Sequence, residues 1–582
     1  MHVLRVEIAN LRGIKSADWT LGGVCLCLIG ANDTTKTTLL DAVDMALSPS
    51  PYLSVSEVDF HNTKTDEPIE IRVTVGGIPP ASHLWTDGKY GFLMRGWKKE
   101  GGLVDEPEDE DCEPVLTVRL RIGSSYEPEW TVMADRNQEG VPISPQNRAQ
   151  LGVVRLGDDI DRDLAWGRYS VLTRLTGGDA AEAVAEAQRK LRNAAKEGNI
   201  DELNAAARTV EEAARKLGVR PSSSYQAALD SKLVTFRQGA FALHDGDIPV
   251  RAAGLGTRRL AALAVQRAAV PDGAIVLIDE VEHGLEPHRI RRLLRNLRQG
   301  LGIGNSGVSE PRLGQVVMTT HSAVPLFELG REHIRVVRPL SGRTDVLSPS
   351  EDTQGVLRTV PAAFLARRVL LCEGATEVGF CRSAAERWRS NHNEVPVEHF
   401  GVEITDGGGS NGPAYAVAMA GLRYAIMYLG DSDRISREDV DSMEHAGVKA
   451  ILWSDKLCLE ERIAVDLPAD GFRRLLEQTC RRRSAQSVAD AIAQALGLRK
   501  TPPNPDRPES WLNGSTDNLS LRHAFGTAAK GTRNCPGWFK TIDGGSFLGL
   551  LVSEHLDAMA STDLGTKLAQ VESWCYQDGG TS

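Results

Sequence analysis

The feature that most constrains the fold is a strand, a loop and a helix that follow one another near the N-terminus. The run "GGVCLCLIG" at 22–30 is apolar enough for a buried strand, and "KTTLLDAVDMAL" at 36–47 has the apolar spacing of a helix. The connecting loop, "GANDTTK", has the register of a phosphate-binding loop, in which backbone N–H groups and the helix N-terminus hold phosphate oxygens. The succession predicts an α/β fold with a nucleotide site at this loop.

The loop departs from the usual pattern at one position. Thr35 stands where such loops keep a glycine before the lysine, and a β-branched residue resists the backbone conformation that this position tends to need. Lys36 still offers its charge to β- and γ-phosphate oxygens, and the Thr37 hydroxyl is suited to a bound Mg²⁺. The residues predicted to bind nucleotide in this loop are Gly30, Asn32, Lys36, Thr37 and Thr38.

Two later strands end in residues that suit the same site. "GAIVLIDEVEHGLEP" at 273–287 ends an apolar strand in Asp279, a candidate metal ligand, and Glu280, a candidate for polarising the attacking water. "QVVMTTHS" ends another strand at His321, a candidate sensor of a γ-phosphate. Taken singly, acids often cap buried strands and a lone histidine is usually structural, so the prediction depends on finding them together.

The order of these motifs resembles that of an ABC-type ATPase head. Between the loop and the Asp-Glu pair, "AAGLGTRRLAALAVQ" at 252–266 is a glycine turn that opens a helix and corresponds to the signature motif. The resemblance implies ATP as the ligand and a homodimer or higher homo-oligomer through the ATPase domain, since two such heads sandwich two nucleotides. Leu255 replaces the usual serine of the signature, so we expect hydrolysis to be slow or absent.

A second constellation consists of carboxylates in the C-terminal half. "VLLCEGATEVGF" at 369–380 is a strand that runs into Glu373, with Glu377 one helical turn later. "YAIMYLGDSDR" is another apolar strand and delivers Asp431 and Asp433 to one side of the chain. Four carboxylates at strand ends repel one another without divalent cations, so the set is typical of a Mg²⁺ or Mn²⁺ phosphodiester site. Either half alone would be read as a solvated loop.

Glu-Gly-x-x-Glu followed by Asp-x-Asp resembles the TOPRIM fold of topoisomerases, primases and certain nucleases. An ABC-type head followed by TOPRIM resembles the OLD (overcoming lysogenization defect) family of ATP-dependent endonucleases, which includes the nuclease subunit of Gabija anti-phage systems. The resemblance covers residues 1–80 and 230–470. It implies a further carboxylate cluster in "CLEERIAVDLP" and a lysine near the C-terminus, although either could be a surface charge. The implied catalytic residues are Glu373, Asp431, Asp433, Lys540 and, in the head, Glu280; the implied metal ligands are Glu373, Glu377, Asp431, Asp433, Glu460 and Glu461.

Composition limits how the chain meets its partners. The net charge of −11, from 67 basic and 78 acidic residues, argues against nucleic-acid binding over the whole protein surface. It is compatible with nucleic-acid binding in a local basic groove. We read the basic face of 288–299 as solvated and prefer "CRRRS" at 480–484 as the phosphate contact. The N-terminus lacks the charged and then apolar order of a signal peptide. No apolar run approaches the about 20 residues that span a bilayer, and the nine cysteines are spread along the sequence. These features predict a cytoplasmic protein with reduced thiols and no membrane partner.

We therefore expect an ABC-type ATPase domain over 1–345, a linker over 346–366, and a TOPRIM nuclease domain with a C-terminal extension over 367–582. The head is expected to have an irregular stretch at about 83–150 and a helical insertion at about 178–217, either a dimerisation arm or a packed hairpin. The predicted function is a nucleotide-regulated, metal-dependent DNA endonuclease; its role in anti-phage defence, with a helicase-like or other defence partner, rests on the resemblance.

Two alternatives stay open. The first is an ATP-dependent DNA repair or chromosome-organising factor that binds DNA without cutting it, and Glu373 with the Asp431 and Asp433 pair argues against it because a binding module has no need of them. The second is a nucleotide-sensing RNA nuclease, because acidic motifs of this kind do not choose between DNA and RNA.

Overall fold

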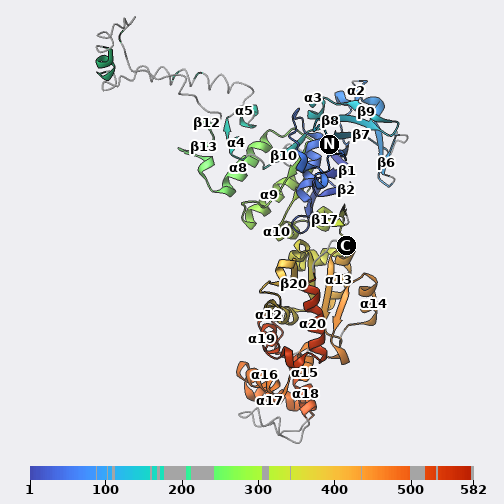
Figure 1. Ribbon diagram of the computed structural model, residues 1–582, viewed down its shortest axis with the longest axis vertical. Coiled ribbons are helices and arrows are strands. Elements are labelled where there is room, and N and C mark those ends of the chain that lie inside the picture. Colours follow the sequence, from blue (N-terminus) through green and yellow to red (C-terminus); the bar gives the residue numbers. More distant parts are fainter. Residues whose placement is uncertain are drawn as a thin grey trace.

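The computed structural model describes residues 1–157, 160–166, 171–175, 205–211, 241–303, 313–497 and 518–577, apart from gaps at 87, 101, 106, 108–111, 341, 434 and 533–534, and the isolated residues 186, 190 and 224. The protein is a mixed α/β structure, as the sequence predicts. Figure 1 shows an N-terminal unit (residues 1–347) built on a large sheet and a C-terminal unit (residues 368–577) built on a four-stranded parallel sheet. Within the described residues, no helix is long and apolar enough to cross a membrane.

One half of the N-terminal sheet is parallel, and its three central strands are completely buried because helices cover both of their faces. The helix α1 (Lys36–Leu47) lies in the core of one face, and α9 (Pro287–Gly300) lies in the core of the other. Strands covered on both faces read as continuous apolar runs, which is why they are visible in the sequence. In sheet order, the parallel strands are β10 (Val153–Leu156), β15 (Ile275–Ile278), β16 (Gln315–Thr319), β3 (Cys25–Ile29) and β17 (Ile334–Leu340).

The other half of the sheet is mainly antiparallel and corrects one prediction. The stretch at 83–150, expected to be irregular, forms five strands. Several glycines and prolines break up the sequence of this stretch, and two of its strands are only three or four residues long, so their alternation is hard to see in the sequence. The remaining strands are β18 (Arg343–Leu347), β2 (Ile14–Thr20), β1 (His2–Leu11), β4 (Ile69–Gly76), β7 (Glu113–Ile122), β5 (Arg95–Lys98), β6 (Gly102–Val104), β8 (Pro128–Ala134) and β9 (Asn137–Pro142).

The predicted helical insertion at 178–217 lies almost entirely outside the described residues. Of this segment the structure describes residues 186, 190 and 205–211, and all of these are helical. Its proposed role in dimerisation therefore stays a prediction.

The C-terminal unit has four parallel strands in the order β20 (Val402–Asp406), β19 (Arg368–Cys372), β21 (Ala425–Gly430) and β22 (Lys449–Leu452). Its helices cover both faces, and one apolar core joins β19 and β21 to the helices at the C-terminal end of the chain. The helices used below are α12 (Ala375–Asn391), α13 (Gly412–Gly421), α15 (Leu459–Asp466), α16 (Ala469–Arg482), α18 (Asn518–Lys530), α19 (Ile542–Ser553) and α20 (Asp563–Cys575).

The segment predicted as a linker, 346–366, is folded and packed between the two units. It contains α11 (Thr353–Thr359) and a 3₁₀ helix (Pro361–Leu365), and its buried side chains belong to a core shared by both units. The Tyr424 hydroxyl donates a hydrogen bond of 2.6 Å to the Phe364 carbonyl. The guanidinium of Arg338 lies 3.4 Å from the ring centre of Tyr424.

Two ion pairs also cross between the units. Asp345 in β18 pairs with Arg423, which comes shortly before β21. Asp33 in the phosphate loop lies 3.6 Å from Arg367, the residue before β19. Both contacts lie at the starting ends of strands in the C-terminal sheet.

Candidate nucleotide and metal sites

Six of the eight predicted nucleotide residues line one pocket, and the other two, Gly30 and Asp279, contact Lys36 and Thr37 of its lining. Because β3, β16 and β15 are parallel neighbours, their carboxyl ends lie at the same edge of the sheet. The loops that follow them enclose a pocket of about 900 Å³. Its lining includes Asn32, Lys36, Thr37, Thr38, Glu280, Glu282, His283 and His321.

Thr35 has a left-handed backbone conformation, which is easy for the usual glycine and costly for threonine. Its φ of 64° and ψ of 18° are left-handed, immediately before α1. For a residue other than glycine this conformation costs about 1–2 kcal/mol. Its hydroxyl donates a hydrogen bond of 2.6 Å to the Thr34 carbonyl and lies 3.4 Å from the Thr344 hydroxyl in β18. The loop therefore keeps the shape that the usual glycine would give.

Lys36 lies folded over the loop. Its Nζ donates hydrogen bonds to the carbonyls of Gly30 at 3.1 Å and Ala31 at 2.7 Å. Burial lowers the pKa of Lys36 to about 8, although the charge of Asp279 and other nearby acids opposes this. Gly30 has a φ of 150°, and a Cβ there would lie 2.8 Å from the Val337 carbonyl oxygen, so the turn requires glycine.

Asp279 and Thr37 meet as the metal prediction requires. The Thr37 hydroxyl donates to Asp279 Oδ1 at 3.2 Å, and the Thr319 hydroxyl donates to the same oxygen at 2.5 Å. Glu280 is half exposed, and its Oε2 lies 3.2 Å from His283 Nδ1. This arrangement suits a cation shared between a hydroxyl and a carboxylate, with Glu280 and its partner His283 in the lining of the pocket.

Glu282 is a residue of this site that the sequence analysis did not single out. It accepts hydrogen bonds of 2.6 Å from both the Thr320 hydroxyl and the His321 backbone N–H. It thereby fixes the loop that carries His321. Its place two residues after Glu280, in the same acidic turn, was the available signal.

The altered signature position packs within the same chain. Leu255 begins α8 (Leu255–Ala268) and is 40% exposed. A Cβ added to Gly284 would lie 2.7 Å from Leu255 Cγ, so the leucine lies directly over this glycine. Leu255 has no hydroxyl to offer a phosphate, and the expected slow hydrolysis stays a prediction.

The predicted metal residues Glu373 and Asp431 also meet at the carboxyl ends of neighbouring parallel strands. They follow β19 and β21, which pair along their length. The Asp431 N–H donates to Glu373 Oε2 at 2.7 Å, and the Leu459 N–H at the start of α15 donates to Asp431 Oδ1 at 2.8 Å. Glu377 is buried in the first turn of α12 and accepts a hydrogen bond of 3.0 Å from the Gly374 N–H.

Glu460 and Lys540 join the same group. The side chain of Glu460 is 0% exposed, and its Oε1 lies 3.2 Å from Lys540 Nζ as an ion pair without hydrogen-bond geometry. Lys540 reaches the site because α19 packs tightly against α12. A Cβ on Gly545 of α19 would collide with the Thr376 carbonyl of α12, so this close approach depends on glycine.

The charges of this group are far from balanced. Burial raises the pKa of Glu377 to about 7; Lys540 opposes the shift, and Glu460 and Glu373 add to it. Burial also raises the pKa of Asp431 well above its usual value, and the nearby glutamates add to this effect. Burial alone would lower the pKa of Lys540, but the surrounding carboxylates outweigh it and raise the pKa. A divalent cation would neutralise this surplus of buried acid.

Two predicted ligands do not join the group. Asp433 forms an ion pair with Lys530 at the end of α18. Glu461 lies in the first turn of α15, where it accepts hydrogen bonds from the Cys458 N–H at 3.3 Å and from the Thr527 hydroxyl at 3.0 Å. Cys458 takes a place that the sequence analysis did not assign: one ligand atom each from Asp431, Cys458 and Glu460 lie within 4.8 Å of one another, and all three residues are buried.

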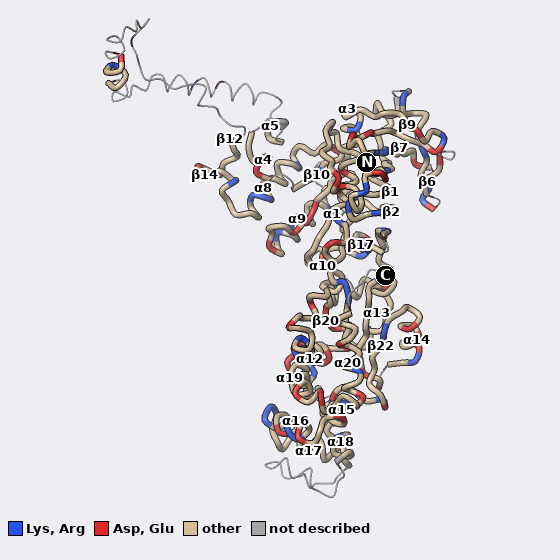
Figure 2. Tube along the Cα trace, in the orientation of Figure 1, with Lys and Arg blue, Asp and Glu red and all other residues tan. Residues whose placement is uncertain are grey.

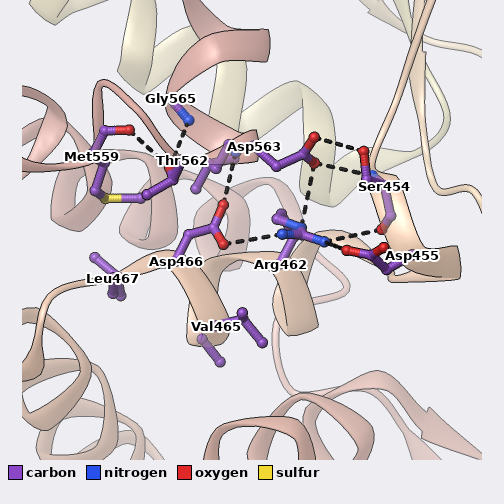
Figure 3. Close-up of polar contacts among 12 residues, drawn as sticks. Ser454, Asp455, Arg462, Val465, Asp466, Leu467, Met559, Thr562, Asp563 and Gly565 are labelled. Carbon is purple, nitrogen blue, oxygen red and sulfur yellow. Dashed lines mark hydrogen bonds and ion pairs between the residues drawn. The ribbon is translucent and has the colours of Figure 1, made fainter. Parts of the chain in front are cut away.

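The helix α15, which carries Glu460, is fixed by an ionic network around the buried Arg462 (Figure 3). Arg462 is 5% exposed and donates hydrogen bonds of 3.0 Å to Asp466 and 2.9 Å to Asp455. Its Nε lies 3.4 Å from Asp563 in α20, which also accepts a hydrogen bond of 2.7 Å from the Ser454 hydroxyl. The network holds α15 against α20 and so sets the position of the residues at its N-terminus.

The preferred phosphate contact lies near the Lys540 loop. Figure 2 shows basic segments along α16, which ends within the predicted 480–484 segment. The side chains at 481–483 are exposed; Arg482 lies 4.2 Å from the ring centre of Phe547, and Arg483 donates a hydrogen bond of 3.4 Å to the Gly537 carbonyl. The 288–299 segment is helical, with Ile290, Leu294 and Leu297 buried and with Arg291 and Arg295 exposed on the basic face.

Comparison with known proteins gives a partial match. Residues 152–326 match the family described as "AAA domain, putative AbiEii toxin, Type IV TA system". The matched segment includes Asp279, Glu280 and His321 and begins after the phosphate loop. Together with the pocket, this match indicates an ATPase-type domain in the N-terminal unit.

Among solved structures, the chain is similar to heads of Smc proteins. The Smc head bound to the C-winged helix domain of ScpA is 16% identical, with a TM-score of 0.34 over 60% of this chain and 98% of that chain. A Smc head with an extended coiled coil bound to the C-terminal domain of ScpA, derived from Pyrococcus furiosus, is 14% identical, with a TM-score of 0.34 over 61% and 98%. The SMC head from Thermotoga maritima is 11% identical, with a TM-score of 0.29 over 60% and 100%. No curated protein matches the sequence.

Proposed function

We propose that this protein is a divalent-metal-dependent endonuclease that cleaves DNA under the control of its nucleotide-binding domain. The observation that carries the proposal is the group of buried Glu377, Asp431 and Glu460 with partly buried Glu373, at the carboxyl edge of a parallel sheet and beside Lys540. Such a surplus of acid is costly without a cation, and divalent cations held by carboxylates are suited to phosphodiester hydrolysis.

Each residue of the group has a role in this proposal. Glu373, Asp431 and Glu460 would hold Mg²⁺ or Mn²⁺, which supplies a coordinated water of lowered pKa and neutralises charge on a phosphoryl oxygen. Glu377, with a pKa of about 7, is suited to accept a proton at neutral pH. Lys540 keeps its proton because its pKa is raised, and its exposed charge is available to a phosphate from the solvent side.

The exposed arginines at 481–483 provide a place for the nucleic-acid backbone. Arg483 contacts the loop that continues into Lys540, so a phosphate bound there lies close to the acid group. Contacts of arginine with phosphates give affinity without base preference. The proposal therefore predicts binding that falls steeply with salt.

The nucleotide site is proposed to regulate the nuclease. ATP would bind at Lys36 and Thr37, with a cation at Asp279, Glu280 beside the attacking water and His321 near the γ-phosphate. The ion pair between Asp33 and Arg367 supports this regulation, because it joins the phosphate loop to the residue before β19, the strand that Glu373 follows. Assembly as a homo-oligomer through the ATPase domain follows from the ABC-type resemblance, and a role in anti-phage defence follows from the OLD resemblance. These two features, with the cytoplasmic location predicted from the sequence composition, are part of the proposal.

A cleavage assay tests the proposal with a matched pair of variants. Plasmid DNA, phage DNA and RNA are incubated with Mg²⁺ or Mn²⁺, with and without ATP or a non-hydrolysable analogue. Glu460→Gln should abolish cleavage, whereas Glu461→Gln, which can keep its helix-cap hydrogen bond, should not.

Asp431→Ala and Glu373→Ala should also abolish cleavage while ATP binding is retained. Near-normal cleavage by Asp431→Ala, with wild-type unfolding behaviour, would contradict the assignment of the site. Metal-dependent cleavage of RNA alone would favour the RNA nuclease, and DNA binding without any cleavage would favour a repair or chromosome-organising factor.

A further inference from the structure

The metal site contains a thiol as well as carboxylates. The ligand atoms of Asp431, Cys458 and Glu460 lie within 4.8 Å of one another, a spacing that a single cation can bridge. Cys458 is buried, so its side chain faces this group and not solvent. The Cys458 thiol therefore lies among the predicted metal-binding groups.

A second observation points to a ligand at this position. The carboxylate of Glu460 is 0% exposed, and neither of its oxygens accepts a hydrogen bond from the described residues. The ion pair with Lys540 neutralises part of the Glu460 charge. Both carboxylate oxygens still have lone pairs that, in a buried carboxylate, normally accept hydrogen bonds. A cation placed between Glu460, Asp431 and Cys458 would use them.

The backbone, and not flexible side chains, brings the three residues together. Cys458 is the N-cap of α15, Leu459 donates its N–H to Asp431, and Glu460 follows within the same helical turn. The network of Arg462 fixes the far end of this short helix. The site is therefore preorganised before any cation binds.

We propose that Cys458 is a direct metal ligand, so that the site binds a thiophilic divalent cation of the Zn²⁺ or Cd²⁺ class more tightly than Mg²⁺ or Mn²⁺, with mixed sulfur and oxygen ligands. Thiolates select such cations, whereas sites made of carboxylates and water suit Mg²⁺ and Mn²⁺. Binding displaces the thiol proton, because the thiolate is the ligand. The inference rests on the metal site of the proposed function and assigns it a ligand and a cation preference.

Ultraviolet absorption of the purified full-length protein during titration with Cd²⁺ tests this ligand directly, because a cadmium–thiolate bond gives a charge-transfer band. Wild type should develop the band with one equivalent of Cd²⁺, and Cys458→Ser should lose it. Glu460→Gln keeps the thiol and should also lose most of the band at that concentration, because the cation is no longer held. Cys480→Ser, which alters a half-buried cysteine elsewhere in the same unit, should behave as wild type.

Equilibrium dialysis gives the matching affinities. Cys458→Ser should bind Cd²⁺ at least about 100-fold more weakly than wild type, since changes in the surroundings of metal ligands already cost about 10–100-fold. Absence of the band in wild type, or an undiminished band in Cys458→Ser, would overturn the proposal. The cleavage assay tests a separate assignment. A cadmium–thiolate band in a protein that cleaves no nucleic acid would support Cys458 as a metal ligand and contradict the proposed nuclease function.

Discussion

Replacing Glu377 with glutamine removes a carboxylate that the fold holds at a cost. Burial raises its pKa from 4.5 to about 7, so between these values the folded protein keeps a proton that the unfolded chain has lost. Stability therefore falls as the pH rises through this window, and the loss is complete above pH 7. The difference between these two pKa values corresponds to roughly 3 kcal/mol of unfolding free energy.

We expect Glu377→Gln to be more stable than wild type by about 3 kcal/mol at pH 8 without divalent cations, and by less than about 1 kcal/mol at pH 5. The glutamine oxygen can still accept the hydrogen bond from the Gly374 N–H, so the comparison isolates the charge. Urea denaturation in a chelating buffer at the two pH values measures the difference.

The control is Glu386→Gln on the same helix, because Glu386 is 71% exposed and should give no pH-dependent difference. Added Mn²⁺ should stabilise wild type more than Glu377→Gln and so narrow the gap at pH 8. Equal stability of wild type and Glu377→Gln at pH 8 would refute the reasoning, because it would mean that the buried carboxylate costs nothing.

Three further substitutions test other parts of the structure. Thr35→Gly removes the strain of a left-handed backbone, which should stabilise the folded protein by about 1–2 kcal/mol, less about 0.5–1 kcal/mol for the added entropy of the unfolded chain. We expect ATP hydrolysis, measured as phosphate produced per unit time, to become faster; an unchanged rate would show that this strain does not limit hydrolysis. Gly545→Ala forces a Cβ against the Thr376 carbonyl and should cost about 1–3 kcal/mol and most of the cleavage activity, whereas Gly421→Ala, which enters open space on α13, should cost neither. Arg462→Met leaves a buried aspartate without its partner and should destabilise the protein to urea by about 3–5 kcal/mol; a loss below about 1 kcal/mol would show that the network does not fix α15.

The sequence predicts the sites best where a buried parallel strand precedes the functional residue. Asp279, His321, Glu373 and Asp431 each follow such a strand, and parallel strands bring their carboxyl ends to one edge. Thr35 was also readable, because the position demands a conformation that its side chain resists. In these cases local sequence and sheet geometry carry the information.

The sequence could not separate Glu460 from Glu461. Both lie in the first turn of α15, and the third residue of a helix often turns back to cap the helix N-terminus, as Glu461 does. This reciprocal pair of hydrogen bonds, a capping box, is usually recognised by serine or threonine at the N-cap. Here the N-cap is Cys458, so the pattern is not visible in the sequence. The placement of Lys540 is likewise unreadable, because it depends on glycines of two helices far apart in the chain.

The ion pairs between the two units have a thermodynamic consequence. β19 runs from beside Arg367 to Glu373, so about 16 Å of stiff strand joins the contact at the phosphate loop to the metal site. If ATP changes the affinity for a cation at Glu373 through this connection, the cation must change the affinity for ATP by the same factor. Titrating ATP at several Mn²⁺ concentrations thus measures the coupling from the side of the nucleotide, with no nucleic acid present.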